Sequence, residues 1–338
     1  MQLQILSTRK YSLLRKAWYN TILAMENEFL HCSNDNSIIC LDEKLLLLNK
    51  CLRKANERFH TSFKYVTDKK AIREVSNSAD SFCFFAAMNL HDIESNKETL
   101  KQISEHLIIY IFDSWETQWA EFEELLKSIK PFAICFAYKR STEFFSKRFE
   151  NCWFVPQSMD SSCFHEYNVD KSRYFIQIGR RTEPLHNMVL SWLASKNIVA
   201  TKDNYVFEEK SGKVVFPDTE KLAKEIAKSY FFLAAPRSLM NKARVGNISE
   251  VTARFYEAMA CKSLIVGVKP EDSFDDLFPF EDAMIEVNDA DFSEHIDFYL
   301  NNSEKYYEIV NRNYEYLMRN HTWKNRYQTI IELINTTF

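Results

Sequence analysis

The chain has 338 residues, 46% hydrophobic and 27% charged, which is typical of a globular protein of about two domains at roughly 150 residues each. Its net charge of −4 and the lack of a concentrated basic stripe argue against a nucleic-acid partner. With four glycines the sequence has no glycine-rich phosphate loop, and no apolar run approaches the roughly 18 residues that a membrane span needs.

The eight cysteines form no C-x-x-C pair and show no zinc-binding spacing. Several of them, such as Cys83 and Cys135, lie inside apolar runs, which is typical of reduced, buried cysteines in a cytosolic protein. Gln2 and Gln4 interrupt the first apolar residues, so the start of the chain does not resemble a signal peptide. We therefore expect a cytoplasmic protein.

The amino-terminal segment is basic. Residues 2–6 predict a first strand, and residues 11–30 and 41–60 predict helices rich in leucine, aromatic residues and Lys or Arg. Residues 1–70 contain 12 Lys and Arg against 7 Asp and Glu, a net charge of +5. Such helices can lie on the inner face of an anionic membrane, with Trp18 at the interface. The alternative, which we favour, is that they pack on the sheet of their own domain.

Short apolar runs alternate with helical segments from residue 80 onward, which predicts right-handed βαβ units and a parallel sheet. Ligands of such sheets bind beyond the carboxyl ends of the strands. Asp113 follows the apolar residues 107–112 and His91 follows 82–88, so both can line a substrate cleft. The alternatives are a turn-capping Asp and a surface His. We expect strands at 81–90, 106–115, 131–138 and 152–157, and helices at 116–129 and 140–149.

A second βα series begins after residue 156. The sequence thus predicts an α/β protein with an N-terminal Rossmann-like domain (1–156), a second one (157–322), and a C-terminal helix (323–338) that packs back on the first. In the second half we expect strands at 174–180, 213–216, 230–236, 263–267 and 283–287, and helices at 183–195, 218–228, 250–261, 290–301, 303–319 and 323–335.

Polar segments that follow strands of the second half are the candidate binding residues. Because the carboxyl ends of parallel strands meet at one edge, arginines, a helix N-terminus and a carboxylate should gather there. This set suits a diphosphate with an attached ribose, the arginines and helix amides binding phosphate and the carboxylate accepting from ribose hydroxyls. The segments are Gly179-Arg180-Arg181, Pro236-Arg237-Ser238, and a helix with Thr252, Arg254 and Glu257.

The start of that last helix is predicted from its flanking residues. Ser249 can cap it and Glu250 would lie in its positive first turn. The role of Glu257 stays open between two alternatives. It can bind ribose, or it can pair with Arg254 or Arg181 as an internal ion pair.

The run VTARFYEAMACKSLIVG resembles the donor-site helix and following strand of GT-B glycosyltransferases, namely retaining family 4 and the group-1-like C-terminal domain of spore-maturation-type enzymes. The R-x-x-E of that family corresponds to Arg254 and Glu257. YFIQIGRR resembles the strand that opens their nucleotide domain, so Gly179 and Arg180 match the Gly-Arg near the diphosphate. FVPQSMDSSCFH resembles their interdomain segment, and the final HTWKNRYQTIIELI their C-terminal helix.

The chain departs from the family at three points, one of which is Lys262 in place of the glycine expected after Ala-Cys. Retaining members carry another glutamate eight positions before the one matched by Glu257, where this chain has Ser249, while Glu250 lies seven positions before it. Either Glu250 substitutes after a local shift, or the contact to the donor sugar is lost. The lysine that follows the family's Gly-Arg is absent, so we expect Arg181 or Arg237 to supply its charge.

The resemblance implies a GT-B enzyme whose two Rossmann-like domains face each other across a cleft. It implies transfer of a sugar, as by a hexosyltransferase, from a nucleotide-diphosphate sugar to a hydroxyl of a cell-surface glycan or lipid-linked precursor, with retention. Asp113, Arg180, Arg237 and Glu250 are the expected catalytic residues.

No metal or further cofactor is expected, since arginines would neutralise the leaving diphosphate and no D-x-D motif lies upstream of the donor site. Two rival functions share this fold. One is a nucleotide-sugar 2-epimerase, and the other is a catalytically degenerate GT-B module that serves as a partner subunit.

Overall fold

The computed structural model describes residues 2–12, 19–76, 81–179, 181–208 and 215–337. These residues divide into two compact units. The first unit comprises Met1–Gln157, Ala243–Gly246 and Arg326–Phe338, and the second comprises Ser158–Lys242 and Asn247–Asn325.

The first unit is built on a six-stranded sheet with strand order β2-β1-β3-β4-β5-β6, in which every neighbouring pair is parallel. Its central strands are continuous apolar runs, as expected of strands covered on both faces. All seven residues of β3 are buried. The strands are β1 (Gln2–Ser7), β2 (Ser37–Cys40), β3 (Ser81–Ala87), β4 (Leu107–Ile111), β5 (Ala133–Phe136) and β6 (Cys152–Phe154).

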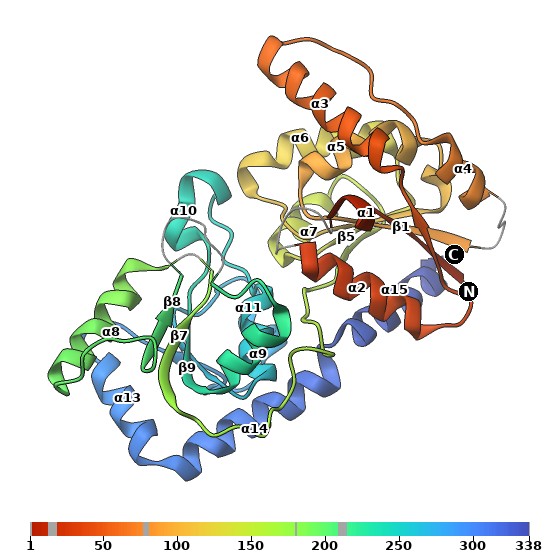
Figure 1. The fold of residues 1–338 in the computed structure, drawn as a ribbon. Helices are drawn as coiled ribbons and strands as arrows, with labels where there is room; N and C mark the ends of the chain where they lie inside the picture. Colours follow the sequence, from red (N-terminus) through yellow and green to blue (C-terminus); the bar gives the residue numbers. More distant parts are fainter. Residues whose placement is uncertain (1, 13–18, 77–80, 180, 209–214, 338) are drawn as a thin grey trace. The chain divides into compact units, whose positions relative to one another are not determined.

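Helices cover both faces of this sheet. On one face α5 packs against both α3 and α6, and α2 and α15 lie on the other face (Figure 1). The carboxylate of Asp42 caps α3 by accepting from the amides of Lys44 and Leu45. The helices are α1 (Arg9–Ser12), α2 (Asn20–Cys32), α3 (Glu43–Phe59), α4 (Lys69–Ser76), α5 (Leu90–Lys101), α6 (Trp119–Ile129), α7 (Lys139–Phe145) and α15 (Trp323–Thr337).

The closing helix α15 is fixed to the first unit by polar contacts as well as by packing. Arg326 Nε donates to the Pro156 carbonyl at 3.0 Å, and Asn36 Nδ2 donates to the Tyr327 hydroxyl at 3.1 Å. The Tyr327 ring also packs edge-on against Phe29 of α2.

The second unit has a five-stranded sheet of order β11-β10-β9-β7-β8, again parallel throughout. Residues of α8, α13 and α14 form a core on one face with Phe231, Leu264 and their neighbours. The helices α9 and α11 contact each other on the side away from α8 and α13 (Figure 1). The strands are β7 (Arg173–Gln177), β8 (Tyr205–Phe207), β9 (Ser229–Ala234), β10 (Leu264–Gly267) and β11 (Ile285–Glu286).

The helices of this unit complete the βα alternation. They are α8 (Glu183–Ser195), α9 (Thr219–Ala227), α10 (Ser238–Val245), α11 (Ala253–Ala260), α12 (Phe274–Leu277), α13 (Phe292–Asn301) and α14 (Ser303–Asn320). The last residues of α10 belong to the first unit.

The predicted α/β class with two Rossmann-like parallel sheets is confirmed. Several elements differ from the prediction. The sequence pattern predicts neither the short strands β2 and β8 nor the helices α4, α5 and α12. The segment 237–247, for which the sequence pattern predicts no helix, contains α10 with a kink at Asn241 (φ −152°, ψ 53°). Of the predicted strand 213–216, residues 213 and 214 lie outside the described part, and Val215 and Phe216 are not in a strand.

The predicted helix 11–30 also lies partly outside the described residues, together with Trp18. No helix in the described part of the chain is both long and apolar enough to cross a membrane.

Candidate functional site

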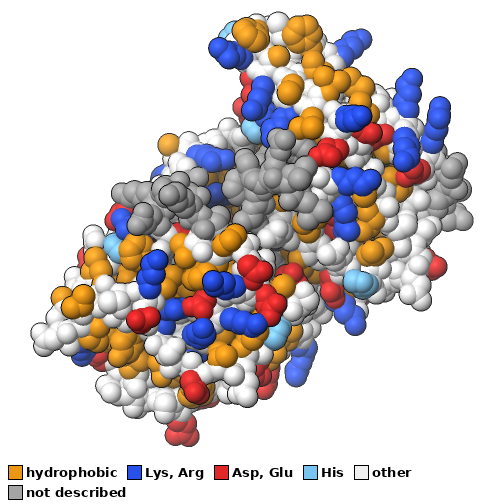
Figure 2. Space-filling model, in the orientation of Figure 1, with side chains coloured by type: hydrophobic (Ala, Val, Ile, Leu, Met, Phe, Trp, Pro, Cys, Tyr) orange, Lys and Arg blue, Asp and Glu red, His pale blue; other side chains and the backbone are white. Residues whose placement is uncertain are grey.

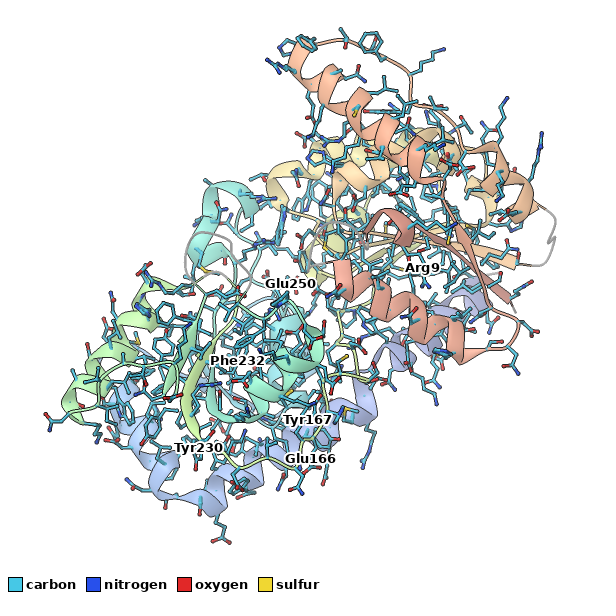
Figure 3. All side chains as sticks on the ribbon, viewed as in Figure 1. Arg9, Glu166, Tyr167, Tyr230, Phe232 and Glu250 are labelled. Carbon is cyan, nitrogen blue, oxygen red and sulfur yellow. The ribbon has the colours of Figure 1, made fainter. Side chains whose placement is uncertain are left out.

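The candidate site lies at the edge of the second sheet where its parallel strands end. Along β9 the chain passes from Tyr230 to Phe232 and on toward the edge at which Glu250 lies (Figure 3). Glu166 and Tyr167 lie at the opposite end, near Tyr230 (Figure 3). Glu250 therefore lies at the edge at which open α/β sheets bind ligands.

The helix α11 supplies the central pair of side chains. It begins at Ala253, and Thr252 is its N-cap residue, although the Thr252 side chain does not cap the helix. One turn into the helix, the Arg254 guanidinium pairs with the Glu257 carboxylate. The Glu257 side chain is only 9% exposed, while that of Arg254 is 38% exposed. The ion-pair alternative for Glu257 is thus present, with Arg254 as its partner.

The prediction that Ser249 caps this helix and that Glu250 lies in its first turn is wrong. Both residues precede the helix and are buried. The Ser249 amide donates to Asp272 Oδ2 at 2.5 Å, and Ser249 Oγ accepts from the Glu271 amide at 3.1 Å. Because these contacts join Ser249 to the loop after β10, it does not cap α11.

Glu250 is held by the same loop. Its carboxylate accepts a hydrogen bond of 2.6 Å from Ser273 Oγ, and the residue is 3% exposed. The carboxylate thus has a fixed position just before α11. Its role toward a donor sugar stays a prediction.

The Gly-Arg segment after β7 combines one ordered turn and one paired arginine. Gly179 has φ +93°, which glycine adopts without strain, and its amide donates to Glu208 Oε2 at 2.7 Å. Arg180 lies outside the described residues. The Arg181 guanidinium lies 2.9 Å from Glu183 Oε1 and 5.3 Å from the centre of the Phe207 ring. Within the described part of the chain, the carboxylate partner of Arg181 is therefore Glu183 and not Glu257.

Arg237 lies between β9 and α10. Its carbonyl accepts from the amides of Met240 and Asn241, which starts the first turn of α10. The arginine is therefore placed at the carboxyl end of the central strand by a helix that the sequence pattern does not predict.

Asp113, the remaining catalytic candidate, belongs to the first unit, beyond the carboxyl end of β4. Its Oδ1 accepts from the Tyr138 hydroxyl at 3.0 Å, and its amide donates to the Met88 carbonyl at 2.8 Å. Asp113 is therefore part of an ordered turn of the first unit, whereas the other catalytic candidates belong to the second.

Three residues of the candidate site are not identified by the sequence pattern: Glu208, Asp272 and Ser273. Each follows a strand, which is the available signal, but β8 is too short to be predicted and the loop after β10 has no motif of its own.

Beneath the edge lies a buried network of polar side chains. His186 Nδ1 is 2.9 Å from the Tyr205 hydroxyl, and this hydroxyl donates to Gln177 Oε1 at 3.2 Å.

One group among the described residues has the composition of a metal site, namely Glu57, His91 and Glu94 in the first unit. Their ligand atoms lie within 4.8 Å of one another. The guanidinium of Arg53 already donates to Glu57 and lies 3.2 Å from His91 Nδ1. Since this cation contacts two of the three members, the group does not support a metal site.

Comparisons with known proteins agree with this architecture. Residues 200–332, which include α11 and the loop after β10, match the family model described as glycosyl transferase-like. No curated protein matches the chain.

Solved structures of similar fold cover most of the chain. They include TarM (TM-score 0.54, 11% identity, 78% of this chain and 57% of TarM). The N-terminal domain of Candida albicans trehalose-6-phosphate phosphatase is also similar (TM-score 0.59, 9% identity, 100% and 97%). A third is a putative UDP-N-acetylglucosamine 2-epimerase from Listeria monocytogenes (TM-score 0.54, 10% identity, 100% and 96%). The chain spans little more than half the length of TarM.

Fold and family match together define the class. The chain has the GT-B fold, with two Rossmann-like units, and residues 200–332, most of which belong to the second unit, match the glycosyl transferase-like family model. The predicted resemblance to GT-B glycosyltransferases is thereby confirmed.

Proposed function

We propose that the chain is a GT-B glycosyltransferase that moves a sugar from a nucleoside-diphosphate sugar to an acceptor hydroxyl. The observation that carries this proposal is the Arg254–Glu257 pair at the start of α11, beyond the strand ends of the second sheet. This pair lies inside the segment that matches the glycosyl transferase-like family. A buried carboxylate next to a helix N-terminus suits a nucleotide whose ribose and phosphates bind side by side.

In this proposal different groups of the second unit bind different parts of the donor. The first-turn amides of α11, together with Thr252, bind phosphate. Glu257 accepts from ribose hydroxyls, and Arg254 holds its carboxylate in place. Arg180, Arg181 and Arg237 neutralise the charge that develops on the diphosphate as the glycosidic bond breaks, so that no metal is needed.

The proposed acceptor is a hydroxyl of a glycan or of its lipid-linked precursor, bound by the first unit with Asp113 nearby. A structure of similar fold, a mutant of S. aureus TarM, was solved with fondaparinux, alpha-GlcNAc-glycerol and UDP (TM-score 0.50, 10% identity, 78% of this chain and 58% of that chain). That ligand set supports a nucleotide donor and a glycan-like acceptor here. Retention of configuration, with Glu250 toward the donor sugar, is part of the proposal.

A nucleotide-sugar 2-epimerase is the second candidate, because the Listeria protein of that description matches over 100% of this chain. The two functions differ in their need for an acceptor. An epimerase acts on the donor alone, whereas a transferase releases its nucleoside diphosphate in step with acceptor glycosylation. The third candidate, a degenerate partner subunit, would bind nucleotide without turnover or not at all.

A thermal-shift panel of UDP, GDP, CDP and their sugars tests the proposal directly. We expect one nucleoside diphosphate to raise the melting temperature of the full chain, and its sugar conjugate to do the same. Mass spectrometry of the selected donor, with and without a glycan acceptor mixture, then separates transfer from epimerisation. A chain that no nucleotide stabilises would contradict the donor site.

We further propose that the first unit contacts an anionic membrane surface through the end of α3. Phe59 and Phe63 are 64% and 54% exposed there. Residues 54–64 contain three Lys or Arg and a single acid. Figure 2 shows hydrophobic side chains at the end of this helix with Lys and Arg beside them. Exposed aromatics flanked by cations suit a bilayer interface with anionic lipids, where a lipid-linked acceptor would be found.

Replacing Phe59 and Phe63 together by serine is expected to lower binding to phosphatidylglycerol vesicles at least about tenfold, since the interfacial burial of two aromatic rings is lost. Vesicle flotation of the full chain measures this. Val199→Ser, which removes a 78% exposed apolar residue of the second unit, is the control and should bind like the parent. Equal binding by the parent and the double variant would contradict the contact.

A further inference from the structure

A pocket lies at the carboxyl-end edge of the first sheet, and no residue predicted for the donor site lines it. Its volume is about 430 Å³, including space open to solvent. Thr8, directly after β1, contributes to its wall, as does His91 in the first turn of α5, after β3. The third wall is α3, through Leu46, Lys50 and Arg53. These three residues are spaced by four and three positions, so they share one face of the helix.

The distinctive group in this wall is Arg53. The residue is 8% exposed, and its Nη1 donates to Glu57 and lies 3.2 Å from His91 Nδ1. Its Nε is buried and has no hydrogen-bond partner among the described residues. A buried donor without a partner is rare in folded proteins and costs free energy. The edge of a guanidinium that includes Nε is also an edge that binds phosphate or carboxylate in bidentate fashion.

The acids around the pocket are already engaged. Asp92 accepts from the Tyr19 hydroxyl and from the Met88 amide, both at 2.9 Å. Burial raises the pKa of the Asp92 carboxyl, which disfavours a negative charge in this wall. Glu94 accepts from the Tyr65 hydroxyl at 2.8 Å. The lining thus combines two cations of α3, Lys50 and Arg53, with one carboxyl, Asp92, whose pKa is raised by burial. Glu57 and Glu94, beside Arg53, are not among the lining residues.

A second arginine near this edge, Arg9, does not line the pocket. Arg9, labelled in Figure 3, lies 3.2 Å from Glu26 Oε2, and Glu26 is buried. Of the side chains that line the pocket in the described part of the chain, Arg53 is the one that is both buried and left with a donor atom without a partner.

We propose that this pocket binds a phosphate group of the acceptor, with the Nε edge of Arg53 and the ammonium of Lys50 as its ligands. This proposal rests on the proposed function for the identity of the bound molecule as an acceptor, but phosphate binding itself does not depend on it. Two cations on one helix face suit a phosphate, which carries up to two negative charges, better than they suit a neutral sugar. The acceptor would thus carry a phosphate group as well as the hydroxyl that receives the sugar.

Calorimetric titration of the full chain with inorganic phosphate and with glycerol 3-phosphate tests the proposal. Arg53→Gln is expected to weaken the binding of both about tenfold or more, because a charge-assisted bidentate contact is lost. Arg58→Gln removes the same charge from an exposed position of the same helix and should leave both affinities unchanged. Parental affinity in a folded Arg53→Gln variant, or an equal loss in Arg58→Gln, would overturn the proposal.

Two further variants keep the test decisive. Lys50→Gln should weaken phosphate binding without removing a buried side chain. It therefore tests the phosphate site even if the Arg53→Gln variant does not fold. Arg53→Lys should recover only part of the affinity, since lysine lacks the planar fork. Full recovery would show that the Nε of Arg53 is not a ligand.

The result of the phosphate titration can be distinguished from the result of the nucleotide-binding test. The nucleoside diphosphate selected by thermal shift should stabilise Arg53→Gln as well as the parent, because the proposed donor residues belong to the second unit. If no nucleotide binds the parent, the proposed function is contradicted. The phosphate titration still tests whether the pocket binds phosphate.

Discussion

Glu257→Gln is expected to weaken binding of the nucleoside diphosphate about tenfold to a hundredfold, with the protein still folded. Hydrogen bonds to a charged group contribute about 1.5–3 kcal/mol, and the glutamine keeps the shape of the side chain while losing its charge. The carboxylate is 9% exposed and paired with Arg254, so it is desolvated and fixed before a ligand arrives. Calorimetry with the selected nucleotide measures the change.

The control separates ribose binding from the ion pair. Arg254→Gln removes the partner of Glu257 but leaves the carboxylate, so it should weaken binding less than Glu257→Gln does. Glu294→Gln, at an exposed position of α13 in the same unit, should have no effect. Wild-type affinity in Glu257→Gln for UDP, GDP and CDP alike would rule out the ribose role.

Arg237→Ala is expected to lower the rate of sugar transfer about a hundredfold to a thousandfold, with a smaller effect on ground-state donor binding. This is the typical cost of removing one preorganised group that stabilises transition-state charge. Its place between β9 and α10 puts it at the end of the central strand of the second sheet. Single-turnover rates at saturating donor measure the effect.

Lys242→Ala is the matched variant, because it removes an exposed cation from the following helix. Its transfer rate should equal that of the parent. If Arg237→Ala retained the parental rate, Arg237 would have to be removed from the catalytic group. If both variants slowed transfer equally, the effect would reflect the general positive charge of this segment rather than a contact with the diphosphate.

Much of the fold is predictable because its signals are local. The continuous apolar runs of β3 and β4 and the helix α8, predicted at 183–195 and observed as Glu183–Ser195, depend on residues close together in the sequence. The short strands β2 and β8 are not predicted, because three or four residues are too few to show a periodic pattern. The helix α10 escapes it because the polar segment between Arg237 and Asn247 has no clear apolar face.

The sequence alone determined the class of this protein: two parallel α/β units, with arginines and a glutamate after the strands of the second. Only the tertiary structure decided where α11 begins, because Ser249 and Glu250 bond to Asp272 and Ser273, about two dozen positions away. It likewise decided that Glu257 pairs with Arg254 and Arg181 with Glu183. The physical reason is common to these cases. Local spacing limits which residues can form a helix or strand, but the partner of a charged or polar side chain depends on which other groups the folded chain brings within reach of it.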